Sequence, residues 1–222
     1  MNIEALYDSC GEAREELAYF MRRLYERGLT TCSGGNLSVR LDENHVIITP
    51  SALDKGRLTA DQIGLLTMKG ENLTPRLKPS IETQMHLQVY TARSDVTAIV
   101  HAHPVMATSF SATHARIDTK LTAEAYAVLG VPAFAEYALM GTQGLADKVS
   151  EAAKGADVVV MENHGILTVG PTLLKAFDRL EVLEAAAKMT IITTLIHSAA
   201  PITPERIAEL DAWSTGGTSS QA

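Results

Sequence analysis

The fold is decided by one short stretch of sequence, TAIVHAHP at residues 97–104. Its apolar and β-branched residues are typical of a buried strand, and Pro104 ends that strand and can open a helix. Side chains at positions i and i+2 of a strand point to the same face. His101 and His103 can therefore reach one metal ion, and imidazole suits zinc and similar borderline metals. The pattern predicts a metal site at the end of a central strand.

A second apolar stretch, VVVMENHG at residues 158–165, predicts a strand that ends in a turn containing His164. A catalytic zinc commonly takes three protein ligands and leaves a fourth position open. We therefore predict His164 as the third ligand, since Gly165 beside it allows close approach of the backbone. A lone histidine is more often a structural hydrogen-bonding residue. The remaining four are interpreted in that way: His45, His86, His114 and His197.

Glu82 is the candidate acid or base. Ser80 is a plausible N-cap, which places Glu82 in the first turn of a helix over residues 80–92. A carboxylate is favoured at a helix N-terminus by the helix dipole, so a purely stabilising role is the alternative interpretation. The neighbouring KPS sequence belongs to the group of turns described next, and it favours the interpretation of Glu82 as a functional acid or base.

Three turns look suited to an anion: SGGNLS, TPSA and KPSIE, at residues 33–38, 49–52 and 78–82. Each places small or hydroxyl residues at a tight turn. Backbone amides, with the side chains of Asn36, Ser51 and Ser80, could hold a phosphate. Three ordinary turns are the alternative, because each motif alone is weak.

The rest of the chain reads as strands paired in hairpins, with helices between and at both ends. Helices are expected over residues 3–27, 59–63, 80–92, 104–112, 142–154 and 171–197, and strands near 36–41, 45–50, 65–68, 97–104, 132–137, 156–161 and 166–169. This pattern predicts an α/β fold, a single α/β/α domain over residues 1–222 with a central, mainly antiparallel sheet. From about residue 205 onward the chain is expected to be a loosely ordered tail.

Composition limits the partners. The net charge of −7 argues against nucleic acid or an anionic membrane surface as the main partner. Two cysteines are too few for a disulfide framework and indicate a reducing compartment. The N-terminus lacks the pattern of a signal peptide, and no apolar run is long enough to span a membrane. We therefore expect a cytoplasmic protein.

Taken in order, GLTTCSGGNLSVR, IITPSA, KPSIETQMH, VHAHP and ENHGIL resemble the class II aldolase/adducin-head family, over residues 4–198. The resemblance implies a homotetramer with its active site at a subunit interface. It implies that His101, His103 and His164 bind Zn²⁺, with Mn²⁺ or Co²⁺ as alternatives. Glu82 would be both a metal ligand and the acid/base. The implied phosphate-binding residues form three pairs: Gly35 and Asn36, Ser51 and Ala52, Ser80 and Ile81.

The implied substrate is a phosphorylated sugar or sugar acid. An aldolase of the fuculose-phosphate type would cleave a ketose 1-phosphate to dihydroxyacetone phosphate and an aldehyde through an enediolate stabilised by the metal. Two departures from such aldolases bear on this. Ser51-Ala52 and Ile81 replace a threonine, a glycine and a serine, and Thr122 lies near the place of a tyrosine proton donor, with Tyr126 one helical turn later.

Several alternatives fit the same residues. They are a decarboxylase of a 3-oxo-tetronate 4-phosphate, a pentulose-phosphate 4-epimerase and a methylthioribulose-phosphate dehydratase. A module for oligomerisation without catalysis, as in adducin heads, is the non-enzyme alternative, and the presence of all four metal-site residues argues against it. A hydrolytic metalloenzyme is the last, although HAHP lacks the further Asp-His of common His-x-His hydrolases.

Overall fold

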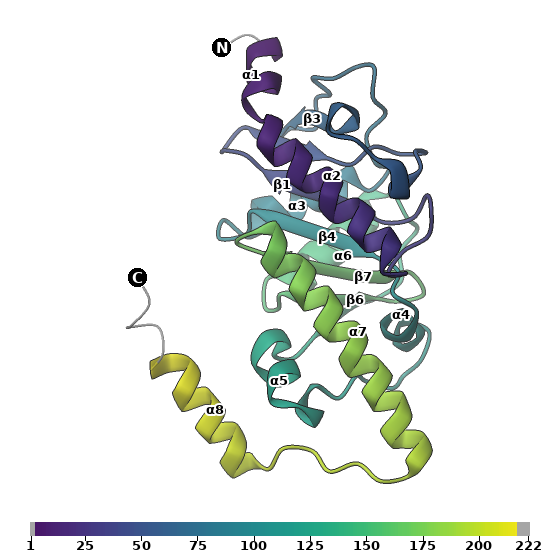
Figure 1. Ribbon diagram of the computed structural model, residues 1–222, viewed down its shortest axis with the longest axis vertical. Helices are drawn as coiled ribbons and strands as arrows, with labels where there is room; N and C mark the ends of the chain where they lie inside the picture. The colour runs from purple at the N-terminus through teal and green to yellow at the C-terminus, as the bar shows by residue number, and fades with distance from the viewer. Residues whose placement is uncertain (1–2, 217–222) are drawn as a thin grey trace.

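One mixed sheet of seven strands forms the centre of the protein, which a computed structural model describes over residues 3–216 (Figure 1). The strand order is β3-β2-β1-β4-β7-β6-β5, and all neighbours are antiparallel except β5 and β6. The strands are β1 (Asn36–Arg40), β2 (His45–Ile48), β3 (Gly64–Thr67), β4 (Ala98–Ala102), β5 (Ala133–Ala135), β6 (Val158–Met161) and β7 (Gly165–Gly170). The predicted mainly antiparallel sheet is confirmed.

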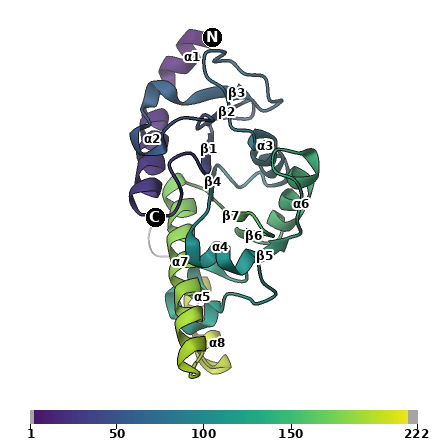
Figure 2. The same cartoon turned by 90° about the vertical axis from the view of Figure 1, so that its right-hand side faces the viewer.

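Helices cover both faces of the sheet. In Figure 1, α2 and α7 lie in front of the strands and α3 and α6 behind them, and Figure 2 shows the same layers from the side. The α-helices are α1 (Ile3–Ser9), α2 (Gly11–Glu26), α3 (Thr83–Ala92), α4 (Val105–Ser111), α5 (Ala123–Leu129), α6 (Gln143–Ala153), α7 (Leu173–Ile196) and α8 (Pro204–Gly216), and the 3₁₀ turns are η1 (Lys55–Arg57), η2 (Ala60–Gln62) and η3 (Thr119–Leu121). The single α/β domain of three layers agrees with the sequence analysis.

Strand β4 shows why the two layers form. Val100 packs in the core cluster that also holds α2 and α7, whereas Ile99 packs in the cluster with α3 and α6. Both side chains are fully buried, and burying one such aliphatic side chain contributes about 1.5–3 kcal/mol. The two-residue period of the strand thus fixes which face each side chain takes. His101 has the same parity as Ile99 and so faces α3.

The helix of residues 3–27 is interrupted. Cys10 has ψ 20 and separates α1 from α2, and Gly11 follows it. A glycine inside a helix costs about 1 kcal/mol, so a break is least costly here. The Tyr7 hydroxyl donates to the carbonyl of Ile63 at 3.0 Å, which holds α1 against the segment after η2. Gly28, with φ 68, follows the C-cap residue Arg27 and ends the helix close to the predicted boundary at residue 27.

The end of the chain also differs from the expectation. Residues Pro204–Gly216 form helix α8, where a loosely ordered tail was predicted from about residue 205. Proline suits the first helical position because its missing N–H needs no partner there. The final residues, 217–222, lie outside the described part. Within residues 3–216, no helix combines the length and apolar character needed to cross a membrane.

Candidate active site

The end of β4 presents two histidines. His101 is fully buried, and its Nδ1 lies 2.9 Å from the carbonyl oxygen of Ile166 on the neighbouring strand β7. A carbonyl can only accept, so Nδ1 carries a proton, and in the neutral imidazole Nε2 keeps its lone pair. His103 follows two residues later, and its ring centroid is 4.8 Å from that of His101. The strand thus brings the two predicted imidazoles together.

The turn between β6 and β7 adds His164. Its ring centroid is 5.0 Å from His101 and 5.7 Å from His103. A Cβ on Gly165 would lie 2.5 Å from Cδ2 of His103 and 2.7 Å from the carbonyl oxygen of Ala102, so only glycine fits at this contact. Ligand atoms of the three histidines lie within 4.8 Å of one another. This spacing allows all three imidazoles to bind one ion.

Glu82 completes the cluster from the start of α3. Its Oε1 lies 2.9 Å from Nε2 of His164, and its Oε2 lies 3.2 Å from Nε2 of His101. Glu82 is itself the N-cap residue, not a first-turn residue as predicted, and its carboxylate makes no capping hydrogen bond. Ser80, predicted as the N-cap, instead accepts from the backbone N–H of Glu82 at 3.2 Å. The carboxylate therefore remains directed at the histidines.

The charges of this cluster are strongly coupled. Burial alone would raise the pKa of the Glu82 carboxyl, but the charge of the neighbouring His101 and the close polar contacts of His101, His164 and Asn36 hold that pKa well below its usual range. Burial opposes protonation of His101, yet the Glu82 charge raises its pKa. Burial and the other two imidazoles lower the pKa of His103 to about 3. Glu82 is thus ionised and His103 neutral near pH 7.

The donor set fits a divalent metal. Nε2 of His101 is buried and makes no aligned hydrogen bond with any described residue, although Oε2 of Glu82 lies 3.2 Å from it. A lone pair and an anionic oxygen at this distance repel one another unless a proton or a cation lies between them. Three imidazoles and one carboxylate are common zinc ligands. The residues could therefore hold such an ion, with the Ile166 carbonyl fixing the orientation of one imidazole.

A cavity of about 570 Å³ opens beside Glu82, His103 and His164. Its wall includes every residue predicted for the phosphate pocket: Gly35, Asn36, Ser51, Ala52, Ser80 and Ile81. The backbone N–H of Ser51 donates to the carbonyl of Lys78 at 2.9 Å, which joins the two turns. The cavity therefore places the three predicted turns and the histidine cluster side by side.

The individual roles available to these residues differ. The side-chain amide of Asn36 donates to Oε2 of Glu82 at 2.7 Å, so it is engaged with the carboxylate. The backbone N–H of Ser51 is used within the fold, as described above. Among the described residues, the amides of Ala52 and Ile81 have no acceptor, and Ala52 adopts φ 59. The turns thus offer free amides at Ala52 and Ile81 and a hydroxyl at Ser51.

The structure adds two lysines that the sequence did not single out. Lys55 and Lys78 both line the cavity, and Lys55 is only 1% exposed. His86, interpreted as structural, is fully buried on α3 with Nδ1 2.6 Å from the Ser38 hydroxyl. No signal in the sequence indicates the burial of Lys55, because the short segment around it has no clear period.

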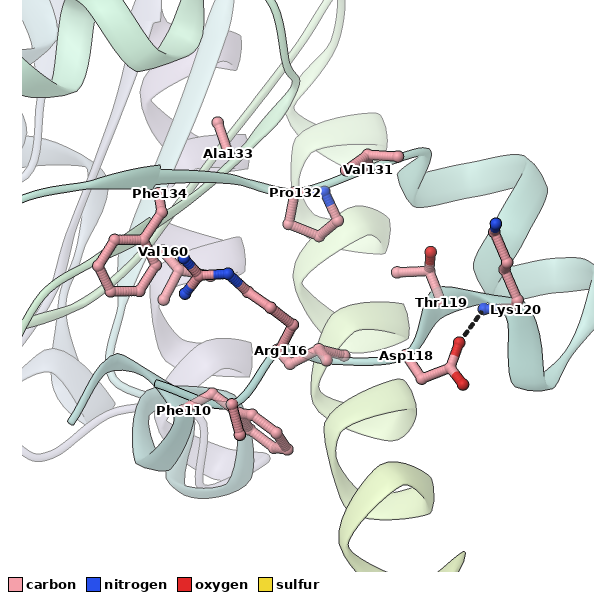
Figure 3. A pocket seen from close by; sticks show the side chains of 12 residues that line it. Phe110, Arg116, Asp118, Thr119, Lys120, Val131, Pro132, Ala133, Phe134 and Val160 are labelled. Atoms are coloured by element: carbon pink, nitrogen blue, oxygen red, sulfur yellow. Dashed lines mark hydrogen bonds between the residues drawn. The ribbon is translucent and has the colours of Figure 1, made fainter. Parts of the chain in front are cut away.

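A second cavity, of about 480 Å³, lies away from the histidines between η3, β5 and α4 (Figure 3). Arg116 lies over the ring of Phe134 there, 4.4 Å from its centroid. The carboxylate of Asp118 accepts from the backbone N–H of Lys120 at 2.9 Å. Within residues 3–216, the group suited to a metal is the His101, His103 and His164 cluster, so the cavity beside that cluster is the candidate active site.

Comparison with known proteins agrees with this geometry. Residues 15–191 match the Class II Aldolase and Adducin N-terminal domain family. An L-fuculose phosphate aldolase of Methanococcus maripaludis is 37% identical over 180 residues, which cover 80% of this chain and 95% of the relative. A 3-oxo-tetronate 4-phosphate decarboxylase of Haemophilus influenzae is 34% identical over 181 residues, covering 79% of this chain and 85% of the relative.

A solved structure of an L-fuculose 1-phosphate aldolase superimposes with a TM-score of 0.82 and 31% identity, covering 90% of this chain and 94% of the other. The chain therefore belongs to the class II aldolase and adducin N-terminal domain family, and within it to the aldolase-type enzymes, whose chemistry depends on a metal.

Proposed function

We propose that the protein is a metal-dependent aldolase that cleaves a ketose 1-phosphate to dihydroxyacetone phosphate and an aldehyde. One observation carries this proposal: the Glu82 carboxylate lies between Nε2 of His101 and Nε2 of His164, at the wall of a cavity that is also lined by the three turns predicted to bind an anion. Acid/base chemistry and phosphate recognition thus meet in one space. The related aldolases named above support the same reaction type.

His101, His103 and His164 are proposed as the metal ligands, with Glu82 as a fourth ligand in the absence of substrate. Zinc is the proposed ion, and manganese or cobalt are alternatives. When bound, such an ion supplies a Lewis acid that stabilises the negative charge of an enediolate. Glu82 then moves the proton on or off carbon, and Asn36 holds its carboxylate in position through the hydrogen bond to Oε2.

The three turns are proposed to bind the phosphate through the hydroxyl of Ser51 and the amides near Gly35, Ala52 and Ile81. Ser80 acts mainly on the fold, because its hydroxyl accepts from the amide of Glu82. Dihydroxyacetone phosphate and its parent sugar are small enough for a cavity of about 570 Å³. We further propose a homotetramer, as the resemblance to the family implies, and a cytoplasmic location, as the sequence indicates.

Decarboxylation of a 3-oxo-tetronate 4-phosphate is the second candidate. Among the described residues, no tyrosine lines the cavity that could take the hydroxyl proton as the aldehyde forms and return it in the reverse reaction. Thr122 caps α5 by accepting from Ala125, and the Tyr126 hydroxyl lies 3.0 Å from Asp211. A decarboxylase forms the same enediolate with carbon dioxide as the leaving group and needs no such donor. The similar decarboxylase of Haemophilus influenzae supports this alternative.

Product analysis tests both candidates. Purified protein is incubated with fuculose 1-phosphate and, separately, with a 3-oxo-tetronate 4-phosphate, and aldehyde and carbon dioxide are measured. The aldolase proposal expects aldehyde, loss of activity on chelation and recovery with zinc, manganese or cobalt. Carbon dioxide without aldehyde would favour the decarboxylase. Full activity after complete metal removal would reject both, and protein with neither metal nor turnover would favour an oligomerisation module.

A further inference from the structure

Lys55 is a buried lysine that pairs with no carboxylate of the described residues. Its ammonium donates to the carbonyl of Pro50 at 2.6 Å. An ammonium has three N–H donors, and among the described residues Pro50 is its single acceptor. No carboxylate of residues 3–216 lies within 4.0 Å of Nζ, whereas the surface lysines Lys148 and Lys154 pair with Glu136 and Glu151. Burying an unpaired charge costs free energy of folding, so the unpaired ammonium of Lys55 indicates a site for an anionic ligand.

The backbone around Lys55 holds it in place. Its N–H donates to the carbonyl of Cys32 at 2.8 Å, which joins η1 to the turn before Gly35. The carboxylate of Asp54 accepts from the amide of Gly56 at 3.0 Å and is thus engaged with its own backbone. A Cβ on Gly56 would lie 2.5 Å from the ring of Tyr25 on α2, so η1 packs closely on that helix. The position of Lys55 is therefore fixed by the fold.

The cavity wall around Lys55 is suited to an anion. Ser51 and Lys78 belong to the same wall, together with the free amides of Ala52 and Ile81. Glu82 is the one acidic residue of this wall among the described residues, and it is engaged with the histidines. The side chain of Ile81 is 55% exposed and offers no hydroxyl, so an additional donor is needed nearby. Burial also lowers the pKa of Lys55 to about 8, which still leaves it mostly charged at neutral pH.

We propose that Lys55 is the residue that recognises the phosphate group of the substrate, through an ion pair between its buried ammonium and the phosphate dianion held at the Ser51–Ala52 turn. The phosphate oxygens accept the hydrogen bonds that the Lys55 ammonium does not make within the protein. The pocket then binds phosphorylated sugars in preference to unphosphorylated ones. The inference rests on the proposed function for the identity of the substrate. Its core claim, binding of a phosphate dianion by Lys55, stands independently of the reaction catalysed.

Inorganic phosphate is the probe for the first test, with affinity measured by isothermal titration calorimetry for the wild type, Lys55→Met, Lys78→Met and the remote control Lys154→Met. Charge-assisted hydrogen bonds predict a loss of about 10- to 100-fold for Lys55→Met. Lys78 is exposed, so its loss is expected to weaken binding less than about 5-fold. Lys154→Met is expected to bind like the wild type.

The same titration after chelation separates the pocket from a bound ion. Phosphate binding that survives chelation and is lost in Lys55→Met supports the proposal. Binding that disappears on chelation but persists in Lys55→Met overturns it, because the phosphate then binds the metal alone. Circular dichroism checks the fold of each variant. Should Lys55→Met fail to fold, Lys55→Gln, which keeps an N–H donor without the charge, is expected to show the same loss, and wild-type affinity in that variant overturns the proposal.

Steady-state kinetics on the phosphorylated substrate provide the second test. If Lys55 binds the phosphate, Lys55→Met is expected to raise KM about 10-fold or more and to change kcat less than about 3-fold. The reason is that the phosphate is bound equally in the ground state and in the transition state. A fall in kcat at unchanged KM would overturn the proposal and assign Lys55 to the chemical step. Loss of phosphate binding in Lys55→Met without any aldolase or decarboxylase turnover would leave this inference intact and remove the proposed function instead.

Discussion

Replacing Lys55 by methionine is expected to stabilise the ligand-free protein at neutral pH. Lys55 is 1% exposed, and burial lowers its pKa from the ordinary 10.5 to about 8. At about 1.36 kcal/mol per pH unit, this difference corresponds to about 3 kcal/mol, the cost of keeping the ammonium charged in the fold. Methionine fills a similar volume without a charge, so most of that cost disappears.

The gain depends on pH in a defined direction. Below pH 8 both the folded and the unfolded chain hold the proton on Lys55, so the folded state carries the full cost. Between about pH 8 and 10.5 the folded state releases the proton while the unfolded state keeps it, and the stability contributed at this site rises with pH. The advantage of Lys55→Met over the wild type is therefore expected to shrink across this window and to vanish above it.

Urea denaturation followed by far-ultraviolet circular dichroism measures the free energy of unfolding of both proteins at each pH. The measurements use one protein concentration and no phosphate, and a thermal melt gives Tm. A gain of about 3 kcal/mol corresponds to a rise in Tm of about 6–12 °C for a chain of this size. Lys154→Met, on the exposed surface, is the control and is expected to change stability by less than about 0.5 kcal/mol. Adding phosphate is expected to stabilise the wild type and to narrow the difference.

A variant that is less stable than the wild type at pH 7, or a difference that stays constant from pH 7 to 10, would refute this reasoning. The first result would mean that the protein compensates the charge of Lys55 without a ligand. The second would mean that the ammonium is not desolvated.

Three further outcomes are expected. Glu82→Gln is expected to lower turnover by about 10² or more while the fold stays intact. The control variant Glu162→Gln, in the turn before His164, is expected to keep the wild-type rate. Equal turnover in the two variants would exclude Glu82 from proton transfer. Gly165→Ala is expected to lower bound metal per chain at least about 10-fold, because its Cβ would lie 2.5 Å from the ring of His103, and an unchanged metal content by mass spectrometry would contradict the geometry. Asn36→Ala is expected to lower kcat about 10-fold through loss of its hydrogen bond to Glu82, and a change in phosphate affinity alone would assign it to the phosphate instead.

The central sheet and the histidine cluster followed from local rules of sequence. Alternation in TAIVHAHP fixes the faces of β4, and the ENHG turn brings the third histidine to the same edge. Both features depend on neighbours in the sequence and on the two-residue period of a strand. Gly165 allows the close approach of the backbone that the sequence predicts, because its Cα lies against Ala102 and the ring of His103.

Features that depend on contacts between distant parts of the chain could not be predicted from the sequence. The burial of Lys55 results from the packing of η1 against Tyr25 and the Cys32 turn, which come together only in the folded state. Asn36 bonds to Glu82, 46 positions later, where the sequence suggested a phosphate ligand. The sequence did not predict helix α8 because Pro201 and Pro204 are typical helix breakers. Pro204 is in fact the first residue of α8, a position where proline is favourable.

The ligand set of the candidate site is gathered from segments that are far apart along the chain. Ala102, between two of the histidines, pairs with Ile166 across β4 and β7, and Glu82 precedes both strands. Closing such long loops is slow, since the entropy is lost before the contacts form. During synthesis, then, a chain that has not yet emerged beyond β7 has no such pocket, and any ion is captured only by the nearly finished fold. Removing that ion would lower the melting point of the whole domain rather than loosen one loop.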